Sequence, residues 1–214
     1  TQPVSQTVNM NGTASFTVAG TGSTPLYYQW FFNGLPISGA TDATLALSNI
    51  MPDAAGEYSA VVSNWVGIAT SAAATLTVNV PAVVTTPPAS QTVNQGANAT
   101  FTVIAGGTAP IYYQWAFNGA SIAGATGTSY IKSNVQPSDA GSYTVTVWNM
   151  CGTNTSDPGV LIVNIPIAIT TQPASQTVAQ GANVTFSVAV TGTLPSYQWY
   201  FGSLRLPDAT NRTL

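Results

Sequence analysis

Apolar and polar residues alternate over short stretches of this chain, and such alternation predicts β-strands rather than helices. Phe16 and Val18 share one face of a first stretch at residues 14–18, and Trp30 lies on the apolar face of a second at residues 28–32. Asn33-Gly34 follows at once, a pair that favours a tight hairpin turn because both residues tolerate positive φ. Further strands are expected at residues 44–47, 58–62 and 74–78. Short strands separated by turn residues predict an all-β fold made of antiparallel β-sandwiches.

The same pattern returns along the chain at an interval of 85 residues. The six residues beginning at Pro3 recur nearly unchanged at Pro88 and Pro173, and a Gln-Trp pair recurs with them. A period of this length is typical of an array of small similar domains. We therefore predict three copies, the third of them incomplete, at residues 1–80, 81–165 and 166–214.

The segments between copies, residues 78–84 and 163–169, are apolar and have a central proline. They lack the Gly-Ser runs of flexible linkers, so we expect stiff junctions and a rod of linked domains.

The third copy ends early, because Leu214 aligns with Leu45 and its last two strands are missing. Half a sandwich exposes its inner face, which needs a facing sheet. Two explanations remain open: the sequence is an excerpt of a longer array, or another chain supplies the missing strands by strand complementation. The residues expected on the exposed inner face are Phe186, Val188, Tyr197 and Trp199.

Composition excludes several classes of protein. The 214 residues are 45% hydrophobic and only 4% charged, which is unlike a disordered chain. A net charge of −3 leaves no basic surface for nucleic acid. No run of about 20 apolar residues is present, so we expect no membrane insertion of this segment.

Three spaced motifs carry a resemblance to a known family. In the first copy Trp30 is followed by Tyr58 within Ala-Gly-Glu-Tyr and by the Asn64-x-x-Gly turn; the second copy repeats them with Asp-Ala-Gly-Ser-Tyr143 and Asn149-x-x-Gly. The pattern resembles immunoglobulin-like domains of the I-set kind, especially the tandem copies of bacterial surface proteins. The resemblance implies a tyrosine corner at Tyr58 and Tyr143. The core residues that it implies are Trp30, Tyr58, Trp115, Tyr143 and Trp199.

Two departures from the family pattern stand out. The family's paired cysteines would lie at Val18 and Ala60 and at Val103 and Val145, so packing around the tryptophans must replace the disulfide. The aspartate of the Asp-Ala-Gly-x-Tyr turn is Asp139 in the second copy, but Ala54 stands at this position in the first, which puts its side-chain hydrogen bond in doubt there.

No catalytic constellation is visible. The chain has no histidine, the commonest general base and metal ligand, and its six acidic residues are scattered over turns. Cys151 is the single cysteine, read as a turn residue or, alternatively, as a cross-link to another chain. Lys132, the single lysine, is expected to be exposed or snorkelling, with an isopeptide bond as the alternative. We expect no enzyme activity, no cofactor and no metal.

Several aromatic residues are expected to point away from the core on the sheet formed by the third, sixth and seventh family strands, C, F and G. Three interpretations remain: a neighbouring unit or loop covers them, they contact a protein partner, or they form a glycan-stacking platform. These candidate contact residues are Tyr27, Phe31, Trp65, Tyr112, Trp148 and Tyr200.

These features favour a structural or interaction protein, an extracellular or cell-surface stalk, adhesin or filament. Its expected partners are other copies of the chain or further immunoglobulin-like repeats, and low charge removes repulsion between chains packed side by side. The alternative is a carbohydrate- or partner-binding module of a larger secreted enzyme, which adds surface glycans to the possible partners.

Overall fold

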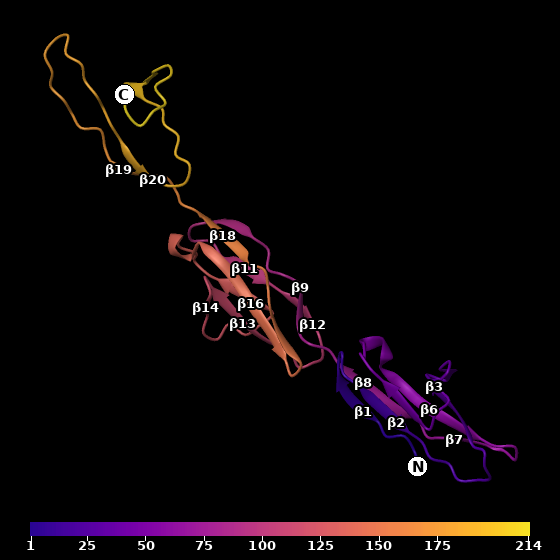
Figure 1. Ribbon diagram of the computed structural model, residues 1–214. Coiled ribbons are helices and arrows are strands. Elements are labelled where there is room, and N and C mark those ends of the chain that lie inside the picture. Colours follow the sequence, from indigo (N-terminus) through magenta and orange to yellow (C-terminus); the bar gives the residue numbers. More distant parts are fainter. The chain divides into compact units, whose positions relative to one another are not determined.

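The computed structural model describes residues 1–214 and is all-β apart from two 3₁₀ turns (Figure 1). The chain divides into two compact units, one made of Thr1–Thr86, Ile104–Tyr113 and Thr146–Thr155, the other of Pro87–Val103, Gln114–Val145 and Ser156–Leu214. The strands of each sheet nevertheless come from a single sequence copy, so we describe the copies as repeat 1 (residues 1–80), repeat 2 (81–165) and repeat 3 (166–214). That all-β, multi-sheet architecture confirms the predicted fold class.

Repeat 1 is a sandwich of two sheets. The larger has the order β1-β8-β6-β3-β4, with β7 also paired to β6, and the smaller is the pair β2-β5. Its elements are β1 (Gln6–Asn9), β2 (Ala14–Thr17), β3 (Tyr27–Phe32), β4 (Leu35–Pro36), β5 (Thr44–Leu47), η1 (Pro52–Ala54), β6 (Gly56–Ser63), β7 (Ile68–Thr70) and β8 (Ala74–Asn79).

Repeat 2 reproduces this sandwich. Its larger sheet has the order β10-β18-β16-β13-β14 with β17 on β16, its smaller sheet is β11-β15, and a further pair, β9-β12, forms at one end. Its elements are β9 (Val83–Thr86), β10 (Gln91–Asn94), β11 (Ala99–Thr102), β12 (Ile104–Gly106), β13 (Tyr112–Phe117), β14 (Ala120–Ser121), β15 (Ser129–Lys132), η2 (Pro137–Asp139), β16 (Gly141–Asn149), β17 (Gly152–Thr155) and β18 (Gly159–Asn164).

Two strand pairs depart from the expected antiparallel arrangement. β1 runs parallel to β8, and β10 runs parallel to β18. The two pairs have the same register, since Gln6 pairs with Leu76 and the equivalent Gln91 pairs with Leu161. Parallel neighbours need a long connection, and here the rest of the sandwich supplies it. A Ser hydroxyl anchors each pair, since Ser5 Oγ accepts a hydrogen bond from the Thr75 N–H at 2.9 Å and Ser90 Oγ one from the Val160 N–H at 3.0 Å.

One tryptophan fills the centre of each complete sandwich. Trp30 and Trp115 are fully buried, and Phe16 and Phe101 pack beside them with ring centroids 6.3 Å away in each repeat. Burial would leave the indole N–H without water, but Trp30 Nε1 donates to the Asp42 carbonyl oxygen at 3.0 Å. The tryptophan therefore both fills the core and holds the loop before β5.

Small apolar side chains stand where the family's disulfide would lie. Val18 and Ala60 are 4% and 0% exposed, and Val103 and Val145 are 5% and 0% exposed. Cys151 is a free thiol. Apolar packing thus takes the place of the covalent bridge in both repeats, as the sequence predicted.

The glutamine of each Gln-Trp pair links two segments of the chain by hydrogen bonds. Gln29 Nε2 donates to the carbonyl oxygens of Trp30 and Ile37, at 2.9 and 2.7 Å. Gln114 and Gln198 make the equivalent two bonds in repeats 2 and 3. This repeated residue ties the β3-type strand to the loop after its hairpin.

The Asn-Gly turn predicted after β3 is present. Asn33 and Gly34 have φ values of 47° and 79°, and β3 pairs with β4 across them. The Asn33 side chain also accepts a hydrogen bond from the Glu57 N–H at 2.9 Å, which joins the turn to β6.

The expected tyrosine corner is present in both complete repeats. The Tyr58 hydroxyl donates to the Ala54 carbonyl oxygen, and the Tyr143 hydroxyl donates to the Asp139 carbonyl oxygen, each at 2.9 Å. Both rings are buried and stack on the core phenylalanines, with centroids 4.9 Å apart for Phe16 and Tyr58. The corner fixes the 3₁₀ turn against the strand that follows it.

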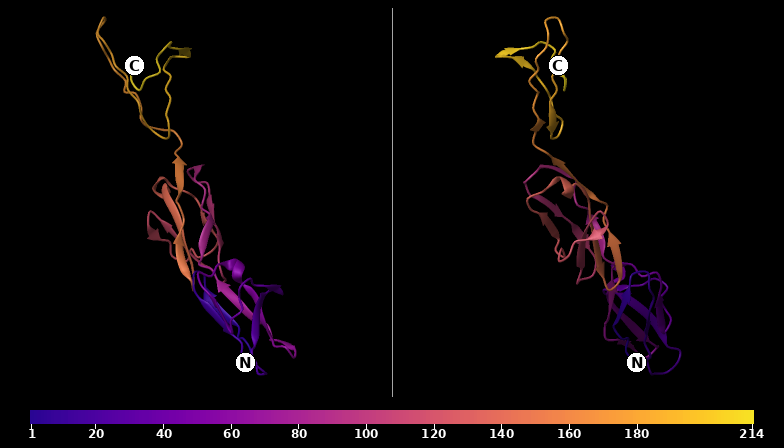
Figure 2. Two further views of the ribbon diagram at one scale, coloured as in Figure 1. Left: turned by 45° about the vertical axis from the view of Figure 1, so that its right-hand side comes forward. Right: turned by 90° about the vertical axis from the view of Figure 1, so that its left-hand side faces the viewer.

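Repeat 3 has the start of the sandwich without its closure. Both views of Figure 2 show this C-terminal segment as open loops with short strands, in contrast to the layered sheets of the other repeats. It pairs β19 with β20 and β21 with β22, and Phe186 and Leu214 exchange backbone hydrogen bonds of 2.9 Å. Its strands are β19 (Ala168–Thr171), β20 (Ala189–Thr191), β21 (Tyr200–Phe201) and β22 (Leu204–Arg205).

Replacement of Tyr143 by Phe should lower the free energy of unfolding of repeat 2 by about 1 kcal/mol, because the Asp139 carbonyl loses its buried donor while the ring remains. Hydrogen-exchange mass spectrometry on peptides of repeat 2 measures the change. Tyr112→Phe is the matched control, since its side chain is half exposed to water. An equal effect of both substitutions would contradict a stabilising role for the corner.

Candidate functional site

The outward aromatic residues of repeat 1 lie on the larger sheet and at its β6–β7 turn. Tyr27 is 61% exposed and Trp65 is 80% exposed, while Phe31 is partly covered. Phe31 pairs across the ladder with Ser59 and with Pro36, which limits its exposure. Val66 and Ile68 extend the exposed apolar surface beside Trp65. The β6–β7 turn therefore carries the most exposed aromatic side chain of this repeat.

The outward aromatic residues of repeat 2 contact each other. The rings of Tyr112 and Trp148 stack with centroids 5.8 Å apart and an interplanar angle of 25°. Tyr112 occupies the place of Tyr27, but Trp148 occupies that of Ser63, so repeat 1 has no equivalent pair. The structure thus brings two of the six candidate contact residues together, on neighbouring strands β13 and β16.

The inner face of repeat 3 is open, as half a sandwich requires. Its candidate residues Phe186, Val188, Tyr197 and Trp199 are all partly exposed, whereas the equivalent Phe16 and Trp30 are fully buried. Val188, Tyr197 and Trp199 line a shallow pocket of about 290 Å³. Tyr200 lies beyond it in β21 and is 57% exposed.

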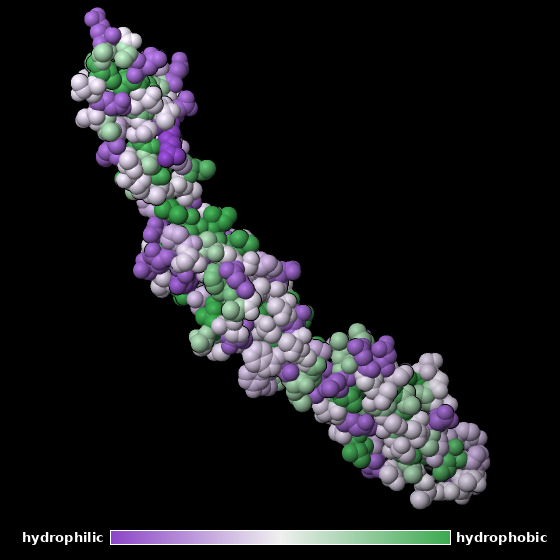
Figure 3. All heavy atoms as spheres, turned by 60° about the vertical axis from the view of Figure 1, so that its left-hand side comes forward, coloured by the Kyte–Doolittle hydropathy of each residue, from purple (hydrophilic) through white to green (hydrophobic).

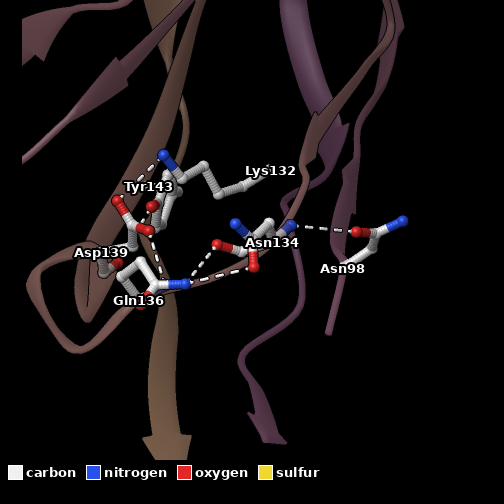
Figure 4. Close-up of polar contacts among 6 residues, drawn as sticks. All are labelled: Asn98, Lys132, Asn134, Gln136, Asp139 and Tyr143. Atoms are coloured by element: carbon white, nitrogen blue, oxygen red, sulfur yellow. Dashed lines mark hydrogen bonds and ion pairs between the residues drawn. The ribbon is translucent and has the colours of Figure 1, made fainter. Parts of the chain in front are cut away.

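One ion pair, Lys132–Asp139, belongs to a network of polar contacts at a turn of repeat 2 (Figure 4). Lys132 Nζ lies 3.0 Å from Asp139 Oδ1, and Asp139 Oδ2 accepts a hydrogen bond from the Gln136 N–H at 2.8 Å. The Gln136 side chain reaches back to the Asn134 carbonyl oxygen at 2.9 Å. The lysine is thus engaged with an aspartate on the turn. The η1 turn of repeat 1 has no side-chain cap, in agreement with the missing aspartate at Ala54.

The contacts of this network shift the pKa values of Asp139 and Tyr143. Burial acts to raise the pKa of Asp139, but the Gln136 N–H and the Lys132 ammonium outweigh it, so the pKa lies below its ordinary value. Burial, together with the charge of Asp139, raises the pKa of Tyr143 to about 12. Burial also raises the pKa of Tyr58. Both corner tyrosines therefore stay neutral hydrogen-bond donors at physiological pH.

Reactive or metal-binding groups do not gather elsewhere. The structure holds no cluster of three or more His, Cys, Asp or Glu side chains that could bind a metal ion. Cys151 is half-buried in the β16–β17 turn, with its Sγ atom 3.5 Å from Asn9 Oδ1. The surface in Figure 3 is mostly pale, with small apolar and polar patches intermixed.

None of the helices has the length and apolar character needed to cross a membrane.

Sequence reasoning missed the role of Asn149, the asparagine of the Asn-x-x-Gly turn. It is 8% exposed and makes five side-chain hydrogen bonds, two of them with backbone groups of Val80 and Ala82. The motif itself was a usable signal, because an asparagine that recurs at a turn in each complete copy indicates a side chain engaged with the backbone. Its partners could not be read from the motif.

Comparison with known proteins finds a family match for part of the chain. A family model described as an immunoglobulin domain matches residues 81–149. The matched residues make up most of repeat 2, and the sandwiches of repeats 1 and 2 have the fold of tandem immunoglobulin-like domains. They lack the usual disulfide.

Two relatives share detectable sequence similarity with these immunoglobulin-like repeats. Hemicentin-1 of Mus musculus is 26% identical over 214 residues, which is 94% of this chain and 4% of hemicentin-1. The decoration protein of Escherichia phage T5 is 47% identical over 60 residues, 28% of this chain and 37% of that protein. The chain therefore spans less than half of the length of each relative.

Solved structures of tandem immunoglobulin domains share the fold. Titin domains I67–I69 superpose with a TM-score of 0.64 at 22% identity, covering 97% of this chain and 80% of that structure. Sidekick-1 immunoglobulin domains 1–5 give a TM-score of 0.56 at 19% identity, covering 100% of this chain and 51% of theirs. At these identities the similarity establishes the fold alone.

We expect the stability of repeat 2 to fall in acid because of Asp139. Its pKa is lower in the folded than in the unfolded state, so the stabilisation is present above the ordinary pKa of about 4 and is lost as pH falls below it. Asp139→Asn keeps an acceptor for the Gln136 N–H but removes the ion pair with Lys132, so it should cost up to about 1 kcal/mol near neutral pH and flatten the acid dependence. Hydrogen exchange of β16 peptides between pH 7 and pH 3 measures both effects.

The matched control is Asp53→Asn, because Asp53 occupies the uncapped η1 turn of repeat 1. A similar acid dependence in the wild-type protein and the Asp139→Asn variant would show that the network does not control the stability of repeat 2.

Proposed function

We propose that this chain is part of an extracellular or cell-surface structural protein, a stalk, adhesin or filament whose immunoglobulin-like repeats associate with further repeats of the same kind. The observation that carries the proposal is the set of outward aromatic residues on and beside the larger sheets. The chief members are the exposed Trp65 in the β6–β7 turn of repeat 1 and, in repeat 2, the exposed Tyr112 stacked on the partly buried Trp148. Exposed aromatic groups gain free energy when a partner covers them.

The scarcity of charge supports lateral association. Only 4% of the residues are charged and the net charge is −3, so two such surfaces approach with little repulsion. Polar side chains around the aromatic groups are uncharged and cost little to desolvate when they find hydrogen-bond partners. The combination suits weak contacts repeated along many modules.

The similar proteins support a modular, non-enzymatic role. Hemicentin-1, titin and sidekick-1 share the immunoglobulin repeats. The insect immune protein hemolin, whose domain arrangement is described as having implications for homophilic adhesion, gives a TM-score of 0.56. The phage relative is named a decoration protein, which suits display on the surface of an assembly. We propose contact between like domains for this chain as well.

The open inner face of repeat 3 offers a second mode of association. Strands equivalent to β16 and β18 would cover Trp199 and Val188, and the same chain or a neighbouring molecule can provide them. The 290 Å³ pocket marks the place that such strands would close.

Association through the aromatic surface predicts a mass that increases with concentration in sedimentation velocity of the full chain. Trp148→Ser should reduce this association about tenfold, the effect of losing an interface aromatic worth about 1.4 kcal/mol. Ile131→Ser is the matched control, since Ile131 is 57% exposed but lies in β15 of the smaller sheet.

A wild-type chain that stays monomeric at every concentration would contradict the proposal. Association that survives Trp148→Ser but is lost in Val188→Asp would place the contact on the inner face of repeat 3 instead.

The alternative function is glycan binding by an accessory module, favoured by the stacked Tyr112–Trp148 pair on an exposed sheet. Aromatic faces of this kind bind the apolar faces of sugar rings. If this function holds, the monomeric chain should be retarded on a polysaccharide column, and Trp148→Ala should abolish retardation while Trp65→Ala leaves it unchanged. Equal elution of all three proteins would eliminate the alternative.

A further inference from the structure

The smaller sheet of repeat 1 has an open edge along β5. This sheet consists of β2 and β5, which are equivalent to the family strands B and E. In immunoglobulin domains of the constant type the corresponding sheet has the order A-B-E-D, so that strand D pairs with strand E. In repeat 1 no strand pairs with β5 on the side away from β2.

The connection from β4 to β5, where strand D would occur, is bound to the larger sheet instead. Residues 37–43 form this connection. The Ile37 N–H donates to the Trp30 carbonyl oxygen at 2.9 Å, and the Trp30 N–H donates to the Ala40 carbonyl oxygen at 3.0 Å. The connection therefore follows β3 and does not pair with β5.

The register of the smaller sheet shows which backbone groups of β5 are free. The Val18 N–H donates to the Ala43 carbonyl oxygen at 3.0 Å at the start of the ladder between β2 and β5. Successive residues of a strand direct their N–H and C=O groups to opposite sides, so Leu45 continues this ladder while Thr44 and Ala46 face the open edge. Both residues are exposed. An edge with free N–H and C=O groups is a template for another strand.

The equivalent edge of repeat 2 carries a protective charge that repeat 1 lacks. β15 ends at Lys132, which pairs with Ala99 as Leu47 of β5 pairs with Ala14. Leu47 packs against the core, so the Lys132 side chain starts toward the same inner side, and its Nζ atom lies 3.0 Å from Asp139 Oδ1. Inward-pointing charged residues are one of the devices that keep edge strands from pairing. β5 has the sequence Thr-Leu-Ala-Leu and has no charge.

A second copy of β5 matches the free groups of this edge. When two β5 strands lie antiparallel, Thr44 of one copy stands opposite Ala46 of the other, and each such pair exchanges both of its N–H···O bonds. Leu45 then faces its own copy across a two-fold axis. The same edge serves both molecules, as in a symmetric dimer, and no charged side chain on β5 opposes the approach.

We propose that the outer edge of β5 in repeat 1 is a strand-pairing site and that its occupant is β5 of a second copy of this chain. The paired strands join two smaller sheets into one sheet of the order β2-β5-β5-β2. A ladder this short is smaller than the interface of a stable complex, so pairing needs the high local concentration of an array of many chains. The pairing goes beyond the aromatic contact proposed above and does not depend on it.

The test measures amide exchange by NMR in the full chain with the Trp148→Ser substitution, which removes most of the aromatic contact. At a concentration where sedimentation shows half of the chains paired, exchange at Thr44 and Ala46 should slow about twofold relative to dilute protein, because only the unpaired chains exchange. The edge amides of Ser129 and Ile131 in β15 should not change.

Two further substitutions in the same chain separate edge pairing from other contacts. Ala46→Pro removes an edge N–H that the ladder with β2 does not use, so the slowing at Thr44 should disappear. Leu47→Lys introduces the charge found in repeat 2 without changing the backbone, and should also reduce the slowing. Ile131→Pro makes the same change as Ala46→Pro in β15 and is the matched control. An unchanged Leu45 amide shows that β5 stays folded.

Several results would overturn the proposal. Exchange at Thr44 and Ala46 that is the same at every concentration would show that the edge does not pair. Slowing that survives both Ala46→Pro and Leu47→Lys would place the contact elsewhere, and equal slowing at Ser129 and Ile131 would contradict the difference between the two edges. A chain that associates only while Trp148 is intact would support the aromatic contact and exclude edge pairing, so the two proposals fail separately.

Discussion

Burial of one tryptophan between two sheets is the interaction on which each sandwich depends. Trp30 and Trp115 are completely removed from water, and each gives its indole N–H to a loop carbonyl oxygen, at Asp42 and Gly127. A buried indole N–H without an acceptor would cost more free energy than the hydrogen bond itself contributes. The position of the ring and that of the loop therefore depend on each other. Without the disulfide, this ring and its phenylalanine and tyrosine neighbours carry the contact between the sheets.

In these repeats uncharged polar side chains make the polar contacts that charged side chains make in many other domains. Glutamine, serine and asparagine residues at fixed places in the repeat bind backbone groups of neighbouring strands, as Gln29, Ser5 and Asn33 do in repeat 1. These bonds satisfy strand ends and turns without leaving net charge on the surface. The result is a stable module whose outer faces do not repel those of its neighbours.

The aromatic contact proposed for such a module uses the outer face of the larger sheet and the β6–β7 turn beside it. Contacts there would join neighbouring chains. The gain comes from covering aromatic groups, such as Trp65 and Tyr112, that are exposed in a single repeat.

The sequence by itself determined the strands, the three copies, the tryptophan core, the Asn33-Gly34 turn and the tyrosine corner. These features follow from short-range periodicity and from motifs whose spacing is repeated, and both are local properties of the chain. It also placed the candidate aromatic residues on outward positions, although alternation could not say that Tyr112 would stack on Trp148. Only the tertiary structure decided the parallel pairing of β1 with β8 and the capture of Val80 and Ala82 by Asn149. Both features join residues about 70 positions apart in the sequence. The partner of an edge strand or of a buried side-chain amide depends on how the whole sandwich packs, and neighbouring residues in the sequence do not determine it.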